Sequence, residues 1–359
     1  MNRCKICIQP DTRPGIEFVD GVCPACNYFE NVHPNVDWEG RDNELKTLLI
    51  QHNSNKDYDC VLGVSGGKDS HCLAKFLKDK GIKALLVCAT YPEGQLTKVG
   101  RKNLDNIANM GFDLIQVRPN PIVWKALMRQ GFLRYGNWCK STEMALYASS
   151  VSIAQKFGID LVFLGENPCL TLGELSHGSD NWDANKMQYS STIKSGIDDL
   201  KLDGMTDADI NMYRYPELKK TQVAYLGYFM KKWSKTHNST LALRLGMKKR
   251  KNDPYKTGAI FGDVEALDDD FVFINQHLKF IKFGFGKVTD EVCEEVRFGR
   301  MNRMQALEMV RMYDGKCHEK YIKKFCRFIG ITITQFEKVV EEYKEDSTFL
   351  ENLKDFIKK

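Results

Sequence analysis

Six consecutive residues, Ser65 to Ser70, have the composition of a phosphate-binding loop: Ser-Gly-Gly-Lys-Asp-Ser. Gly66 and Gly67 have no Cβ atom, so an anion can approach their backbone N–H groups closely. Such groups bind anions best where a loop leads into the N-terminus of a helix, because the helix dipole there favours negative charge. The loop is therefore a phosphate site if a helix follows it directly.

The flanking residues predict that arrangement. Residues 60–64 form a short, nearly continuous apolar run, as expected for a parallel strand buried on both faces. Residues 69–80 place apolar side chains on one stripe of a helix, and Gly81 follows at its end. Strand, loop and helix thus follow one another around Ser65-Gly66-Gly67.

Two commoner phosphate loops do not fit these residues. A Walker A loop has four residues between its glycines and Ser or Thr after the lysine, whereas Gly63 and Gly67 enclose three and Asp69 follows Lys68. The dinucleotide fingerprint fails because Ser65 occupies the place of its second glycine. Residues 65–70 instead resemble the PP-loop of the ATP pyrophosphatase superfamily, which implies cleavage of ATP to AMP and pyrophosphate.

Four cysteines near the start of the chain have the spacing of a metal site. Cys4-x-x-Cys7 and Cys23-x-x-Cys26 fit a four-thiolate zinc centre, which would be structural because it leaves no open ligand position. Two disulfides are the alternative. A redox-active pair fits less well, since neither pair is predicted to open a helix after a strand.

Composition and charge limit the classes of function. The chain has 359 residues, 43% of them apolar, with 52 basic and 47 acidic residues and a formal net charge of +5. This balance suits anionic substrates but not a nucleic-acid-binding surface, so no nucleic-acid partner is expected. No stretch approaches the roughly 18 apolar residues of a membrane span, and no signal-peptide core is present. We therefore expect a cytoplasmic protein with no membrane partner and with reduced thiols.

Further strands and helices complete an α/β pattern with a Rossmann-like parallel sheet. Ligands of such sheets bind at the carboxyl ends of the strands, where the strand order reverses. The residues that follow the predicted strands are therefore candidates, among them Tyr91, Glu93, Arg118 and Asn120. The other predicted strands are 84–90, 112–117, 161–164 and 223–230, and the predicted helices are 37–52, 98–110 and a long passage over 122–157.

A second candidate segment, Gly165-Glu166-Asn167-Pro168, follows the predicted strand 161–164. An acidic side chain and an amide at this edge of the sheet could hold Mg²⁺ or orient a substrate. The alternative is a turn in which Asn167 caps the next helix.

Three regions are predicted along the chain: a four-cysteine module (1–36), an ATP-binding α/β domain (37–235) and a mainly helical domain (236–359). Within them, residues 171–221 are polar and predict a substrate-side excursion or lid, and residues 231–256 are basic, either to meet phosphates or as a solvated face. In the last region a helix over 271–283 is followed by predicted caps at Thr289, at Asn302 and at Thr334 with Glu337.

The whole chain resembles the N-acetyl sugar amidotransferases of bacterial lipopolysaccharide and flagellin-glycan synthesis. This likeness implies a fold of the adenine nucleotide alpha-hydrolase (PP-loop) type, and it is weakest over 124–150 and 171–220, where the sugar specificity would be set. It rests on the loop, the cysteine knuckles and segments 4–15, 21–26, 100–106, 165–167, 281–287, 297–300 and 313–315.

The resemblance implies a reaction and a role for each candidate residue. An acetamido group of a sugar, free or nucleotide-linked, would be activated by ATP as an O-adenylyl imidate, and ammonia would then give the acetamidino group. Lys68, Asp69 and Glu166 would be catalytic, with Lys68 as countercharge and Asp69 on Mg²⁺. The phosphate cradle and the rest of the nucleotide site would come from Ser65, Gly66, Gly67, Ser70, Gly165 and Asn167.

Ammonia is expected from a partner. The chain has no catalytic cysteine next to Met1 and no G-x-C-x-G turn, so it lacks the usual thiol routes for releasing ammonia from glutamine. The resemblance implies separate subunits similar to the glutaminase and cyclase of imidazole glycerol phosphate synthase. Part of the C-terminal helical surface is the predicted docking site.

Two other functions fit part of the sequence. A tRNA-thiolating enzyme also combines a PP-loop with zinc knuckles, and Cys139 and Cys169 are candidate sulfur carriers, although buried packing thiols are the simpler interpretation. A zinc-ribbon adaptor with a degenerate nucleotide pocket is the third hypothesis, and the intact Ser65 to Ser70 sequence speaks against it.

Overall fold

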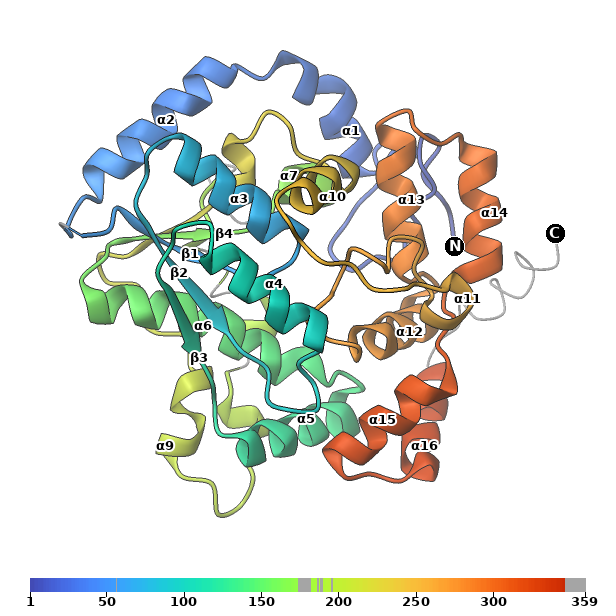
Figure 1. Ribbon diagram of the computed structural model, residues 1–359. Helices are drawn as coiled ribbons and strands as arrows, with labels where there is room; N and C mark the ends of the chain where they lie inside the picture. Colours follow the sequence, from blue (N-terminus) through green and yellow to red (C-terminus); the bar gives the residue numbers. More distant parts are fainter. Residues whose placement is uncertain (56, 174–181, 186, 188–189, 195, 346–359) are drawn as a thin grey trace.

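A five-stranded, all-parallel sheet forms the centre of the fold, as the sequence predicted, and its strand order is β3-β2-β1-β4-β5 (Figure 1). The computed structural model describes residues 1–55, 57–173, 182–185, 187, 190–194 and 196–345. The strand order reverses beside β1, whose neighbours are β2 and β4, so their carboxyl ends flank the point where ligands of such sheets bind. The strands are β1 (Cys60–Gly63), β2 (Ala84–Ala89), β3 (Leu114–Val117), β4 (Leu161–Leu164) and β5 (Gln222–Tyr225).

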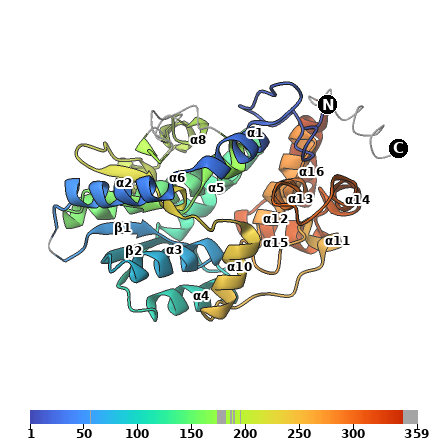
Figure 2. The same ribbon diagram turned by 90° about the horizontal axis from the view of Figure 1, so that it is seen from above.

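Helices cover both faces of the sheet, because alternate side chains of each strand point in opposite directions. In β1, Leu62 packs with α2 (Trp38–Gln51), α3 (Lys68–Asp79) and α4 (Lys98–Ala108), whereas Val61 packs with α6 (Cys139–Phe157) on the other face. Figure 2 shows α3 and α4 on the opposite side of β1 and β2 from α6. The loop before α3 is thereby held at one edge of a buried layer.

Two predicted elements differ in extent. The strand predicted over 223–230 ends at Tyr225, and a 3₁₀ turn, η5 (Leu226–Phe229), follows it. The long helical passage over 122–157 is two helices, α5 (Pro121–Tyr135) and α6, because Gly136 ends α5 in the left-handed conformation. Both corrections come from chain reversals that apolar periodicity does not reveal.

The C-terminal region is helical, as predicted, but two of its predicted caps are wrong. Thr289 lies inside α13 (Lys287–Arg297), where its hydroxyl donates to Asp314 at 2.6 Å. The last capping box is formed by Thr332 and Gln335, in place of Thr334 and Glu337. Asn302 caps α14 (Arg303–Tyr313) as predicted, and the other helices of this region are α12 (Val272–Phe283), α15 (Glu319–Ile329) and α16 (Ile333–Glu345).

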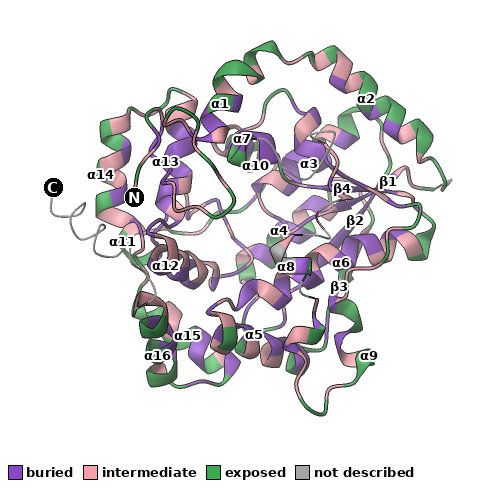
Figure 3. Cartoon of the chain, turned by 180° about the vertical axis from the view of Figure 1, so that it is seen from behind, coloured by how far each residue is buried: buried purple, intermediate pink, exposed green. Residues whose placement is uncertain are grey.

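The largest apolar core joins the predicted helical domain to the α/β domain. Trp124 and Phe132 of α5 pack with Phe271 and Phe325 near α12 and α15, and all four side chains are fully buried. Figure 3 shows buried residues along the sheet and α13 and exposed residues on the outer faces of α2 and α9 (Asp207–Ile210). None of the helices in the described part of the chain has the length and hydrophobicity needed to cross a bilayer.

Within the described residues, shorter helices and 3₁₀ turns connect these layers. They are α1 (Pro24–Asn31), α7 (Pro168–Leu172), α8 (Ser191–Lys194), α10 (Lys235–Arg244), α11 (Pro254–Thr257) and α9, with η1 (His33–Asn35) and η3 (Asp198–Leu200) among the turns. A further turn, η4 (Asn211–Tyr213), follows α9 directly.

Candidate functional site

A cavity of about 360 Å³ lies at the carboxyl ends of β1 and β4, where the strand order predicts a ligand. We call it the sheet cavity. Its volume lies within the usual range of small-molecule sites. The lining includes Gly63, Val64, Ser65, Asp69, Ser70, Tyr91, Tyr147, Ser150, Gly165, Glu166 and Asp268.

The predicted phosphate loop leads from β1 into α3, which begins at Lys68, one residue earlier than predicted. Gly66 has a φ of +84°, and a Cβ atom there would lie 3.0 Å from the backbone nitrogen of Leu104, so glycine is required. Gly67 is the N-cap of α3, and the hydroxyl of Ser70 accepts a hydrogen bond from the nitrogen of Ser65 at 3.0 Å. These contacts close the loop around the N-terminus of a helix.

Lys68 does not line the sheet cavity but is buried behind the loop. Its ammonium group lies 2.8 Å from Oδ2 of Asp69 and 3.1 Å from Oε1 of Glu265. Burial alone would lower the pKa of Lys68, but the two carboxylates outweigh it and raise the pKa. Asp69 lines the cavity, and its other oxygen accepts from the side-chain amide of Asn238 at 2.7 Å.

Glu166 enters the cavity from the segment after β4, but its neighbour Asn167 does not. The protein around Glu166 raises its pKa to about 7, with a further contribution from Asp69, although the side chain stays open to the cavity. Asn167 is buried; its amide donates to the carbonyl of Gly227 at 2.8 Å, and its oxygen accepts from the nitrogen of Leu170. It thus caps α7, the alternative role weighed for it.

Three lining residues were not predicted from the sequence. Asp268 lies in a loop some two hundred residues after the phosphate loop, and desolvation raises its pKa to about 6. Tyr147 and Ser150 project from the middle of α6, and the nearby Glu166 raises the pKa of Tyr147, so its phenol stays protonated. The only sequence feature that could have indicated one of these three residues as part of a site was the run of aspartates at 268–270.

Of Tyr91, Glu93, Arg118 and Asn120, which were predicted to follow strands, Tyr91 alone lines the cavity. Glu93 and Arg118 are exposed, and Asn120 caps α5 by accepting from the nitrogen of Ile122 at 2.9 Å. The basic segment 231–256 supplies no lining residue either, and most of its lysines are exposed. The predicted excursion over 171–221 falls partly on residues outside the described part of the chain.

The four predicted ligand cysteines form one buried cluster. Ligand atoms of Cys4, Cys7, Cys23 and Cys26 all lie within 4.8 Å of one another, and all four are free thiols. The sulfurs of Cys7 and Cys23 are 3.7 Å apart, close to the spacing of about 3.8 Å in a tetrahedral site with Zn–S bonds of about 2.3 Å. The cluster can therefore bind a metal ion such as zinc.

Backbone groups support this arrangement of sulfurs. The nitrogens of Gln9 and Cys23 donate to the sulfurs of Cys7 and Cys4, each at 3.3 Å, as expected for thiolate ligands. Cys23 is also the N-cap of α1, so the second pair opens a helix, but an isolated bridge and not a strand precedes it.

The cysteine module packs on α13 and α14. The guanidinium of Arg303 donates to the carbonyls of Cys4 and Cys7, each at 3.2 Å, and Cys293 of α13 packs in the same core. Arg297 lies half-buried beside the cluster; its desolvation lowers its pKa, but negative charge on the neighbouring cysteine sulfurs outweighs this and raises the pKa. A positive charge here would offset the excess negative charge of a four-thiolate metal centre.

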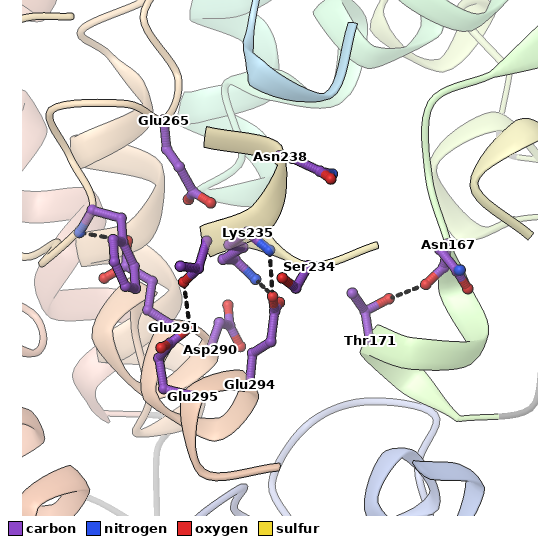
Figure 4. A network of polar contacts seen from close by, with 12 residues as sticks. Asn167, Thr171, Ser234, Lys235, Asn238, Glu265, Asp290, Glu291, Glu294 and Glu295 are labelled. Carbon is purple, nitrogen blue, oxygen red and sulfur yellow. Dashed lines mark hydrogen bonds and ion pairs between the residues drawn. The ribbon is translucent and has the colours of Figure 1, made fainter. Parts of the chain in front are cut away.

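The opposite side of α13 carries a network of polar contacts that includes ion pairs (Figure 4). Lys235 of α10 donates to Glu294 at 2.7 Å from its side chain and at 2.5 Å from its backbone nitrogen. Glu265 forms ion pairs with Lys287 of α13 and with Lys68 of the phosphate loop. We call Glu265, Lys287, Asp290, Glu294 and Lys235 the α13 cluster; it links the cysteine module to the phosphate loop.

One comparison with known proteins gave a match. Residues 268–359 match the family model described as the C-terminal domain of WbpG-like lipopolysaccharide biosynthesis proteins. No curated protein matches the chain. The match begins at Asp268, so this lining residue of the sheet cavity falls within it, whereas the phosphate loop and Glu166 fall outside.

Proposed function

We propose that the chain is an ATP-dependent amidotransferase of bacterial glycan synthesis, which converts an acetamido group of a sugar into an acetamidino group. The observation that carries the proposal is the phosphate loop opening into a cavity with carboxylates at the carboxyl ends of the strands. The match of the C-terminal region to lipopolysaccharide biosynthesis proteins supports the substrate class.

ATP and Mg²⁺ suit the residues at this site. Gly66 is fixed as glycine by its positive φ and by the backbone of Leu104, whereas a Cβ atom at Gly67 would meet only the hydroxyl of Ser65 at 3.5 Å, so the loop leaves space beside Gly67 for a phosphate group. Asp69, Glu166 and Asp268 offer carboxylate oxygens, the ligands that Mg²⁺ prefers. When bound there, Mg²⁺ would neutralise charge on the phosphates.

The chemistry requires activation of a stable amide. We propose that the acetamide oxygen attacks the α-phosphorus of ATP, so that an O–P bond forms, the bond to the bridging oxygen breaks and pyrophosphate leaves. The amide nitrogen loses its proton and an O-adenylyl imidate results. Ammonia then adds to the imidate carbon, and AMP leaves with the former amide oxygen, which gives the amidine.

Each residue of the site has a part in this scheme. The backbone of Ser65, Gly66 and Gly67 would hold the pyrophosphate group, and holding charge where it develops is the main electrostatic source of catalysis. Glu166, whose pKa is raised to about 7, is suited to take the amide proton near neutral pH. Lys68 would act from behind the loop as a countercharge, because it is held by Asp69 and Glu265.

Ammonia would come from separate glutaminase and cyclase-like subunits, and the four-cysteine cluster would hold zinc as a structural ion. The zinc assignment is supported by the four sulfur ligands and by the 3.7 Å between the sulfurs of Cys7 and Cys23. A four-thiolate site leaves no ligand position for substrate, so we assign it no step in the reaction.

The rival hypothesis of tRNA thiolation gains no support from the positions of its candidate cysteines. Cys139 and Cys169 are both buried, and neither lines the sheet cavity. Burial raises the pKa of Cys139 well above its ordinary value, whereas a sulfur carrier needs an accessible thiolate. We expect Cys139→Ser and Cys169→Ser variants to retain amidation.

An isotope experiment tests the proposal. The purified protein is given ATP, Mg²⁺, ammonium chloride and N-acetylated sugars, free or nucleotide-linked, whose acetamide oxygen is ¹⁸O. Mass spectrometry should find one ¹⁸O atom in AMP, equal amounts of pyrophosphate, and an amidine product. Formation of ADP, AMP without the label, or amidine in the absence of ATP would each contradict the proposal.

A further inference from the structure

A second cavity, distinct from the sheet cavity, lies between α5 and the end of α15. Its volume is about 570 Å³, which also falls in the range of small-ligand sites. We call it the α5–α15 cleft. Its polar walls are Lys125, Arg129 and Arg327, and its apolar walls are Leu133, Leu202 and Phe328.

Among the described residues, none of the three basic side chains of the cleft forms an ion pair, and no acidic residue lines the cleft. Neighbouring basic residues on the same helices are paired. Arg134 of α5 contacts Asp199 at 3.2 Å, and Lys324 of α15 contacts Asp270 at 3.0 Å. Carboxylates are thus present nearby but are not used to neutralise the cleft.

The arrangement of these charges indicates the size and charge of a ligand. Lys125 and Arg129 are four residues apart and so share one face of α5, while Arg327 lines the same cleft from α15. Cations from two helices match an anion with at least two charges, and guanidinium groups are well suited to phosphate oxygens. The ammonium group of Lys125 lies over the ring of Phe328 at 4.8 Å, and Leu133 and Leu202 add an apolar surface for the rest of a ligand.

We infer that the α5–α15 cleft binds an organic diphosphate, in which a diphosphate group is attached to a planar or apolar body. A nucleoside diphosphate and a prenyl diphosphate share this chemistry. The inference rests on the cleft itself and does not depend on the proposed amidation reaction.

Two contacts connect the cleft with the sheet cavity. Phe328 of the cleft lies against Gly94, and Trp124 of α5 packs its ring 5.9 Å from that of Tyr91, which lines the sheet cavity. The segment 91–95 therefore forms part of the wall between them. Gln95 fixes this segment, because it accepts from Trp124 at 2.8 Å and donates to Asp269 at 3.0 Å.

Binding by variants tests the inference. UDP, geranyl diphosphate, inorganic pyrophosphate and uridine are titrated by calorimetry into the wild-type chain and into Arg129→Gln/Arg327→Gln. We expect UDP or geranyl diphosphate to bind, and binding to weaken about tenfold for each charge removed, or about 100-fold in the double variant. Which of the two binds identifies the body attached to the diphosphate.

A matched control separates this effect from a general change of charge. Arg134→Gln/Lys323→Gln removes one exposed basic residue from each of the same two helices, outside the cleft, and should bind as the wild type does. Hydrogen exchange with bound UDP or geranyl diphosphate should protect peptides of α5 and the last turn of α15. Equal binding by the two double variants, protection confined to residues 63–70, or equally tight binding of inorganic pyrophosphate or uridine would each overturn the inference.

Discussion

The sheet cavity and the α13 cluster both contain carboxyl groups, yet the pKa values of these groups shift in opposite directions in the two places. In the cavity, no basic side chain of the described chain forms an ion pair with Glu166 or Asp268, and their pKa values are raised to about 7 and about 6. In the α13 cluster, Glu265, Asp290 and Glu294 each pair with lysine, and their pKa values are lowered despite burial.

The difference separates carboxylates that stabilise the fold from those that are available to a ligand. In a buried ion pair, the lysine stabilises the charged form of the carboxylate, and the pair holds neighbouring elements together. A carboxyl group without a counterion is less stable in its charged form, so its pKa is raised. Raised pKa values in a cavity are typical of binding and catalytic residues. Asp69 belongs to both groups, because it lines the cavity and pairs with Lys68.

The largest effect is expected where the two groups meet. Asp69→Ala should reduce AMP formation on the order of 1000-fold, because it removes a proposed Mg²⁺ ligand and a partner of Lys68. AMP is measured by chromatography, and bound zinc, measured by mass spectrometry, should not change. Asp79→Ala, an exposed substitution on the same helix, should keep full activity; substantial turnover by Asp69→Ala would show that the assigned role is wrong.

Within the α13 cluster, Glu265→Gln should lower the free energy of unfolding by about 3 kcal/mol. The variant removes the carboxylate that pairs with the half-buried Lys287 and one of the two carboxylates that hold Lys68. Denaturant unfolding measures the change. As a control, Asp263→Asn breaks the ion pair with Lys249 at the surface and should change the free energy of unfolding by no more than about 0.5 kcal/mol. Equal losses of stability in the two variants would contradict the structural role assigned to Glu265.

In the cavity, the same kind of change should affect activity and not stability. Glu166→Gln should slow amidine formation about 100-fold, the usual contribution of a general base, and should leave the free energy of unfolding unchanged or higher. The wild-type rate should rise with pH through about 7 as Glu166 loses its proton, and the variant should lose this rise. A variant with normal rates and lower stability would place Glu166 with the structural carboxylates.

The smallest effect concerns how stability depends on pH. The pKa of Asp268 is about 6 in the folded chain, above its unfolded value of about 3.9. Between about pH 4 and 6 the folded chain therefore binds a proton that the unfolded chain has lost, and this proton stabilises the fold. The stabilisation is lost as pH rises through this range. In this pH range the free energy of unfolding should fall less steeply with rising pH in Asp268→Asn than in the wild type. The two slopes should differ by at most about 1.4 kcal/mol per pH unit.

The α13 cluster should respond to pH in the opposite direction. Its carboxylates have lowered pKa values, so the stability they contribute is present above about pH 4.3 and is lost as pH falls below it. Glu265→Gln should therefore weaken the acid-induced loss of stability, and Asp268→Asn should not. Urea unfolding at a series of pH values measures both slopes, and the same response from both variants would contradict the comparison.

The features that the sequence predicted correctly are set by neighbouring residues. The apolar run 60–64, the glycines after it and the amphipathic stripe 69–80 predict strand, loop and helix, since each depends on local spacing. The two CxxC pairs likewise predict one cluster, because each knuckle brings its own two sulfurs together. The correct prediction of Asn302 as the cap of α14 likewise depends on neighbouring residues alone.

Only the tertiary structure decided which distant side chains join these local features. Asp268 enters the cavity, and Glu265 reaches Lys68, because the segment before α12 packs against the N-terminus of α4: a Cβ atom at Gly100 would lie 2.4 Å from the Cα of Asp268. Asn167 caps α7 instead of lining the cavity, because η5 brings the carbonyl of Gly227 within 2.8 Å. Such contacts depend on how layers pack, and sequence periodicity carries no information about packing between segments far apart in the chain.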